Sequence, residues 1–221
     1  MRSKIGSACM VLGVVLLAAA IALLVYNTYE DSRAGASVAA VADALESIRQ
    51  ADSEAVSYVP APSQEQENEV SEESLPFASE PEATEEAIAV AEVDGYTYMG
   101  TLSIPSLSLE LPIQYEWSYP GLKISPGRYS GSVWGNNLVI CGHNYTSHFG
   151  KLKRLLPGDT VIFTDLLGNA FYYTVSEVVT LQPTDVSQML SELDGEWDLT
   201  LFTCTLGGQT RVTVRCSKAE E

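Results

Sequence analysis

The sequence has few basic residues, with 12 lysines and arginines against 29 acidic residues among 221, giving a formal net charge of −17. This balance argues against nucleic acid as a partner, because binding to phosphates needs clustered cations. Residues 27–95 hold 17 acidic and two basic residues, whereas residues 96–221 hold 12 acidic and eight basic ones. The negative charge therefore belongs mainly to the middle of the chain and says little about the partners of the C-terminal part.

Cysteine is also scarce, with four in the whole chain. Cys9 lies in an apolar N-terminal run, which leaves Cys141, Cys204 and Cys216 in the remainder. An odd number of cysteines cannot all pair, so these three do not indicate a disulfide framework. A bond between Cys141 and Cys216 stays possible if their strands are neighbours. The simpler interpretation makes these two small buried strand residues.

The N-terminal run is the one long hydrophobic stretch, from Ile5 to Tyr26. At about 1.5 Å per residue it spans roughly 33 Å, close to the hydrocarbon thickness of a bilayer. It is longer than the apolar region of a cleaved signal peptide, so residues 1–26 are predicted to be an uncleaved signal anchor. Arg2 and Lys4 precede it, which puts the N-terminus in the cytoplasm and the rest of the chain outside the cell.

Large apolar residues are few in the next segment, residues 27–95, and especially in residues 60–87, which are rich in Glu, Ser, Pro and Ala. Such a segment cannot bury enough surface to offset chain entropy, so we expect a largely disordered acidic stalk. Within it, Val38, Val41, Leu45 and Ile48 recur at helical spacing and predict a short helix over residues 37–56.

From Tyr96 the pattern changes to short runs of alternating or β-branched residues separated by turn signals, including residues 125–131, "SPGRYSG". This pattern predicts an all-β barrel or sandwich over residues 96–221. A helix is predicted over residues 183–195, and a second, short one over residues 148–155.

The chain has two histidines, so a nucleophilic cysteine has two candidates for its imidazole partner. His143 follows the apolar run "NNLVICG", and Cys204 ends the run "LTLFTC". If these strands are parallel neighbours, both groups emerge at the same rim of the sheet. Arg211 begins the next run after a short turn, where a guanidinium would stabilise an oxyanion. His148 lies in a polar loop with no such strand to hold it.

No metal or cofactor is predicted. The acidic alternation of Glu192, Asp194, Glu196 and Asp198 suggests calcium at first sight, but it lacks the loop signature of an EF-hand. We interpret it as a solvated helix end and turn.

The order "CGHN", then "TLFTC", then an arginine at the start of the last strand closely resembles the sortases, which are membrane-anchored cysteine transpeptidases of mainly Gram-positive bacteria. The core motif TLxTC is matched by residues 200–204, and the resemblance covers about Tyr96 to Lys218. The Asp-Pro-aromatic lid signature that pilus-building members often carry is not found, so no subclass is assigned.

The resemblance implies an eight-stranded β-barrel, with Cys204 as nucleophile, His143 as its proton-transfer partner, Arg211 as oxyanion or substrate stabiliser and Thr203 as a substrate-positioning residue. It also implies the partners, which are surface proteins carrying a Leu-Pro-any-Thr-Gly-like sorting signal and an accepting amine from a cell-wall precursor or a pilin. The alternatives are a pilin polymerase, an L,D-transpeptidase-like wall enzyme, and a non-catalytic stalked adhesin or binding module.

Overall fold

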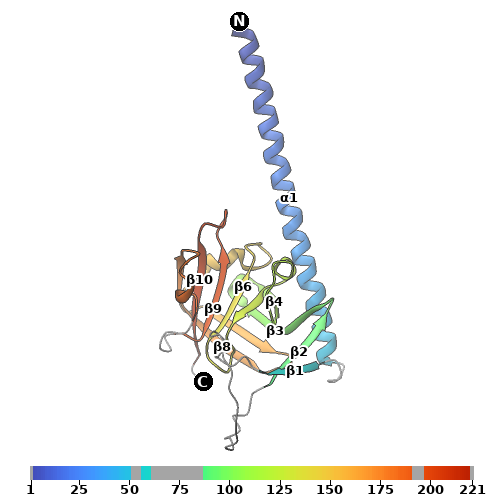
Figure 1. The fold of residues 1–221 in the computed structure, drawn as a ribbon, viewed down its shortest axis with the longest axis vertical. Coiled ribbons are helices and arrows are strands. Elements are labelled where there is room, and N and C mark those ends of the chain that lie inside the picture. Colours follow the sequence, from blue (N-terminus) through green and yellow to red (C-terminus); the bar gives the residue numbers. More distant parts are fainter. Residues whose placement is uncertain (1, 51–55, 61–86, 191–196, 220–221) are drawn as a thin grey trace, which may run out of the picture.

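The computed structural model describes residues 2–50, 56–60, 87–190 and 197–219. It begins with one long helix, α1 (Arg2–Gln50), which extends well beyond the rest of the molecule (Figure 1). By length and composition this helix is able to cross a membrane, and the side chains of its apolar part from Gly6 to Tyr29 are exposed. This agrees with the predicted N-terminal apolar helix.

The separate helix predicted over residues 37–56 is wrong in its bounds. The same residues continue α1 without a break as far as Gln50, and Val56–Pro60 forms a strand, β1. No proline interrupts residues 27–36. The helix therefore continues from the apolar run into the predicted stripe, where Val38, Val41 and Leu45 are buried.

Eight strands form a closed barrel in the described part of the chain. They run in the order β3-β4-β5-β6-β9-β10-β8-β7, and β7 pairs back with β3 to close it. Their bounds are β3 (Tyr96–Ile104), β4 (Leu109–Gln114), β5 (Gly127–Ser130), β6 (Leu138–Gly142), β7 (Thr160–Asp165), β8 (Ala170–Leu181), β9 (Leu199–Cys204) and β10 (Arg211–Lys218). The predicted eight-stranded, mainly β architecture is confirmed.

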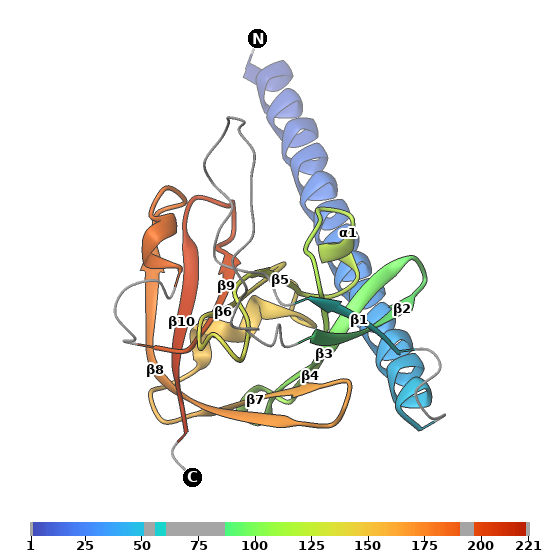
Figure 2. The same cartoon turned by 60° about the horizontal axis from the view of Figure 1, so that its bottom comes forward.

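Two further strands extend the sheet from β3 into the region expected to be disordered. β2 (Ala87–Val93) pairs with β3, and β1 pairs with β2. Ile88 and Val90 join the barrel core, while Ala89 and Ala91 pack toward α1. Figure 2 shows β2 lying beside α1. The sheet therefore begins before Tyr96. The sequence does not predict this strand, because the short apolar run lies in a segment, residues 27–95, whose average composition is acidic and polar. Residues 61–86 of the expected stalk lie outside the described residues.

The apolar side chains divide between two places. One cluster fills the barrel, and a smaller one lies between α1 and the outside of the sheet, where Val41 and Leu45 meet Ala91, Tyr98 and Leu166. Burying each large aliphatic side chain contributes about 1.5–3 kcal/mol. The long helix is therefore packed on the barrel along its second half.

Two local predictions differ from the structure, and the short helix predicted over residues 148–155 is present as a 3-10 helix. Residues 127–130, predicted as part of a turn, form strand β5, a short strand in which glycine and arginine mask the β pattern. Residues 148–155 contain the 3-10 helix η3 (Phe149–Arg154). In the described residues 183–190 of the helix predicted over residues 183–195, the structure has the 3-10 turn η4 (Val186–Gln188) in place of an α-helix. Residues 191–196 lie outside the described part.

Candidate active site

Strand pairing brings the ends of three strands to one edge of the sheet. β6 and β9 are parallel, with Gly142 opposite Thr203, so His143 and Cys204 each follow at the same level. β9 and β10 are antiparallel, with Arg211 directly opposite Cys204. Side chains of directly opposed residues project from the same face of a sheet. The predicted parallel neighbours, β6 and β9, are thus present.

Alternation along β9 decides which side chains face the barrel interior. Leu199 and Leu201 belong to the core, so Thr203 points inward while Phe202 and Cys204 point outward. Thr203 is buried, and its hydroxyl donates a 2.8 Å hydrogen bond to the carbonyl oxygen of Gly142. This bond joins β6 to β9 immediately before His143 and Cys204. Cys204 itself is half-buried and carries a free thiol.

His143 is half-buried at the end of β6. Burial lowers the pKa of its imidazole, and the nearby positive charge of Lys123 lowers it further. Both effects disfavour the imidazolium. Near neutral pH the ring is therefore uncharged and able to accept a proton.

Arg211 is held at the turn between β9 and β10. Its Nη1 atom donates hydrogen bonds to the carbonyl oxygens of Gly208, at 3.0 Å, and Thr210, at 3.2 Å. Arg211 is partly buried, and its backbone register fixes it opposite Cys204. These bonds hold the side chain on the turn that follows Cys204.

The other two barrel cysteines are buried in strands and are not bonded to each other. Cys141 and Cys216 are free thiols, and burial raises the pKa of each to about 12. β9 lies between β6, which carries Cys141, and β10, which carries Cys216. Their thiols stay protonated near neutral pH, which leaves Cys204 as the accessible thiol of the barrel.

An aromatic row lies on the outer face beside the nucleophile strand. The ring of Phe202 contacts that of Tyr129 at 5.4 Å between centroids, Tyr129 stacks on Trp117 at 5.9 Å, and Trp117 meets Tyr119 at 5.4 Å. Phe202 and Cys204 share one face of β9. Apolar surface therefore adjoins the thiol.

The loop after His143 is attached to α1, and no spacing or motif in the sequence predicts this contact. The backbone N–H and the hydroxyl of Ser147 both donate to the Asp31 carboxylate, at 3.1 and 3.2 Å, and the hydroxyl also reaches the Asp31 carbonyl oxygen. The Tyr145 ring lies between the rings of His143 and His148. His148 is fully buried, and burial lowers its pKa to about 4, so it packs as a neutral ring.

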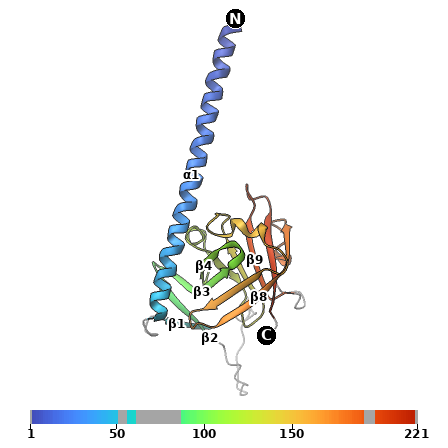
Figure 3. The same cartoon turned by 180° about the vertical axis from the view of Figure 1, so that it is seen from behind.

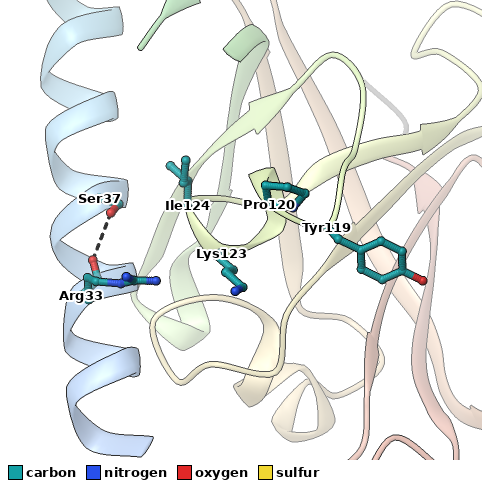
Figure 4. Close-up of a pocket in the computed structure, with 6 residues that line it drawn as sticks. All are labelled: Arg33, Ser37, Tyr119, Pro120, Lys123 and Ile124. Atoms are coloured by element: carbon teal, nitrogen blue, oxygen red, sulfur yellow. Dashed lines mark hydrogen bonds between the residues drawn. The ribbon is translucent and has the colours of Figure 1, made fainter. Parts of the chain in front are cut away.

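A cleft of about 500 Å³ lies between α1 and the segment before β5 (Figure 4). Arg33 and Ser37 line it from the helix, and Tyr119, Pro120, Lys123 and Ile124 line it from the opposite side. Lys123 is common to the cleft and to the electrostatic surroundings of His143. The cleft therefore adjoins the site, and no cysteine is among the residues that line it.

Metal-binding clusters of three or more His, Cys, Asp or Glu residues are not found among the described residues. Of the acidic alternation considered for calcium, Glu192, Asp194 and Glu196 lie outside those residues. Asp198 accepts a hydrogen bond of 2.6 Å from the backbone N–H of Lys218. The geometry at the sheet edge is that of a thiol, an imidazole and a guanidinium.

The Sortase domain family model matches residues 102–219 of this chain. Curated proteins give no significant match. Among solved structures, sortase C1 from Streptococcus agalactiae is 27% identical with a TM-score of 0.50, over 59% of this chain and 72% of that one. Sortase A from Corynebacterium diphtheriae is 24% identical with a TM-score of 0.51, over 57% and 62%. A sortase D5 transpeptidase from Clostridium perfringens is 22% identical with a TM-score of 0.50, over 56% and 79%.

Proposed function

The chain belongs to the sortase family, whose members are generally cysteine transpeptidases, and from this premise we propose a specific reaction for it. It cleaves a C-terminal sorting signal similar to Leu-Pro-any-Thr-Gly on surface proteins and transfers the protein to an amine of a cell-wall precursor. The observation that carries the proposal is the register of β6, β9 and β10, which aligns His143, Cys204 and Arg211 at one edge.

In the first half-reaction the neutral imidazole of His143 takes the proton of the Cys204 thiol, and the sulfur attacks the carbonyl carbon of the signal's threonine. The carbonyl oxygen becomes an oxyanion, which Arg211 stabilises. The peptide bond then breaks, and its nitrogen leaves with the proton held by His143. A thioacyl-enzyme remains on Cys204.

In the second half-reaction the amine of the acceptor attacks the thioester carbon and gives up a proton to His143. The carbon–sulfur bond breaks, the sulfur recovers a proton, and a new amide joins the surface protein to the acceptor. The apolar row of Phe202, Tyr129 and Trp117 supports binding of the apolar residues of the signal beside Cys204. Thr203 acts by fixing the strand that carries the nucleophile, through its bond to Gly142.

The proposed setting is the outer face of the cell membrane, with α1 as a single anchor and the N-terminus in the cytoplasm. The apolar part of α1 and the basic residues Arg2 and Lys4 ahead of it support this orientation.

The test is cleavage of a fluorogenic sorting-signal peptide by the full chain and by Cys204→Ala, with intact mass measured when acceptor amine is withheld. We expect an acyl adduct on the unmodified chain, and neither cleavage nor adduct in the variant. Cys216→Ala is the matched control, because it removes a thiol that is buried in the adjacent strand. Cleavage that survives in Cys204→Ala would overturn the mechanism.

A further inference from the structure

The edge of the barrel that holds His143 and Cys204 lies level with the part of α1 that follows the apolar run. Asp31, which holds Ser147, comes five residues after Tyr26, a distance of roughly 8 Å along a helix. The ring of Tyr145 contacts that of His143. Burial raises the pKa of Tyr145, and the nearby carboxylate of Glu30 on α1 raises it further. The catalytic edge is therefore at the membrane-side end of the domain.

The opposite end of the barrel lies much farther along the helix. Leu166, at the turn between β7 and β8, packs with Val41 and Leu45. Leu45 is 19 residues beyond Tyr26, which corresponds to roughly 28 Å of helix. Because α1 is continuous from the apolar run through these contacts, it fixes which end of the barrel is near the membrane.

Basic side chains gather at the catalytic end. The 3-10 helix η3 caps this end, since Phe149 and Leu152 are buried in the core and the Phe149 N–H donates to the carbonyl oxygen of His143. Three cations lie on η3, namely Lys151, Lys153 and Arg154, and an exposed Lys123 lies beside His143. On the facing part of α1, the Glu30 carboxylate pairs with Arg33, and the Asp31 carboxylate accepts hydrogen bonds from Ser147.

An apolar tip projects from the same end. The turn between β9 and β10 begins directly after Cys204 and extends toward the end of the molecule from which the N-terminal part of α1 emerges (Figures 1 and 3). Leu206, on this turn, is 91% exposed. A leucine this exposed has no packing role within the barrel.

We propose that the catalytic end of the barrel docks on the surface of the bilayer that holds α1, with Leu206 entering the headgroup region and Lys123, Lys151, Lys153 and Arg154 facing anionic lipid. Polybasic segments beside a membrane anchor are attracted to anionic headgroups, and exposed apolar side chains insert at the interface. The lipid surface is favoured as occupant because α1, already in the membrane, is continuous with this end. The inference rests on the membrane anchor of the proposed function.

The test places a fluorophore at position 206 of the full chain in vesicles of phosphatidylcholine and phosphatidylglycerol that carry a headgroup nitroxide quencher. Leu206→Cys is labelled in a Cys9→Ser, Cys204→Ala background, in which Cys141 and Cys216 stay buried. Leu167→Cys is the matched control, since Leu167 is 56% exposed on the turn near Leu45. We expect severalfold stronger quenching at 206 than at 167. Equal quenching at the two positions, or none at 206, would overturn the proposal.

A charge-reversed variant tests the electrostatic part. We expect the triple variant Lys151→Glu, Lys153→Glu, Arg154→Glu to lower the quenching at 206. Raising the salt to about 1 M, where the screening length is about 3 Å, should have the same effect. Quenching at 206 that is unaffected by either change refutes attraction to anionic lipid. Flotation of the labelled chain with the vesicles distinguishes a failure of the proposed membrane anchor from a failure of the proposed docking. A chain that does not float refutes the anchor, and a chain that floats without quenching at 206 refutes the docking alone.

Discussion

Lys123 is the residue whose charge most directly affects the chemistry of His143. Burial lowers the pKa of the imidazole below the ordinary value of 6.5, and the charge of Lys123 lowers it further. Replacing the lysine by methionine removes this charge, so the pKa rises and His143 becomes protonated at a higher pH. We predict that the acid limb of the kcat/KM profile of Lys123→Met moves to higher pH.

Lys123→Arg is the control, because it retains the charge and should leave the acid limb in place. An identical pH profile in Lys123→Met would contradict the influence assigned to the lysine. The placement of Cys204, His143 and Arg211 at one sheet edge was predictable from sequence, because each adjoins a recognisable strand end. The influence of Lys123 was not, since it lies in the short 3-10 helix η2 (Gly121–Lys123), twenty residues before His143, and its effect depends on distance in space.

Helix α1 contributes a part of the site through Asp31. Replacing Asp31 by alanine removes both hydrogen bonds from Ser147 to its carboxylate, each contributing on the order of 1 kcal/mol. The loop that leads from His143 to η3 is then held to the helix only by the bond from the Ser147 hydroxyl to the backbone carbonyl oxygen of residue 31. We predict a severalfold lower kcat for Asp31→Ala, measured with the fluorogenic peptide on the full chain.

Asp43→Ala is the matched control for this element, because it removes the same charge from an exposed position of the same helix. A kcat of Asp31→Ala equal to that of Asp43→Ala would contradict the role of the attachment. The amphipathic stripe of α1 was visible in the sequence, but its docking surface was not. That surface comes from β2, whose small apolar residues lie in an acid-rich segment, and from contacts between residues more than 40 positions apart.

Closure of the whole barrel depends on Gly100 of β3, where β7 approaches closely. A Cβ atom at this position would lie 2.3 Å from the carbonyl oxygen of Thr164 and 2.8 Å from the Phe163 ring. The backbone would have to move apart at the pairing that closes the barrel. We predict that Gly100→Ala lowers the free energy of unfolding by about 1–3 kcal/mol, measured by denaturant titration.

Glu110→Ala, at an exposed position of the neighbouring β4, should stay within about 0.5 kcal/mol of the unmodified chain. Unaltered stability of Gly100→Ala would mean that β3 and β7 tolerate a wider separation. The eight-stranded barrel itself followed from the resemblance and from the strand spacing. The two added strands and β5 did not, because short segments with alanine, glycine or arginine have weak β signals.

The parallel pairing of β6 with β9 also determines when reactivity appears during folding. His143 and Cys204 are 61 positions apart, and β7 and β8 lie between them in the chain. Pairing over such a separation is slow, because the chain loses the entropy of closing a long loop before the strand contacts form and offset that loss. A newly made chain therefore carries Cys204 as an ordinary thiol, without a proton acceptor beside it. Under the proposed mechanism, the ability to open peptide bonds is among the last properties that the folding chain acquires.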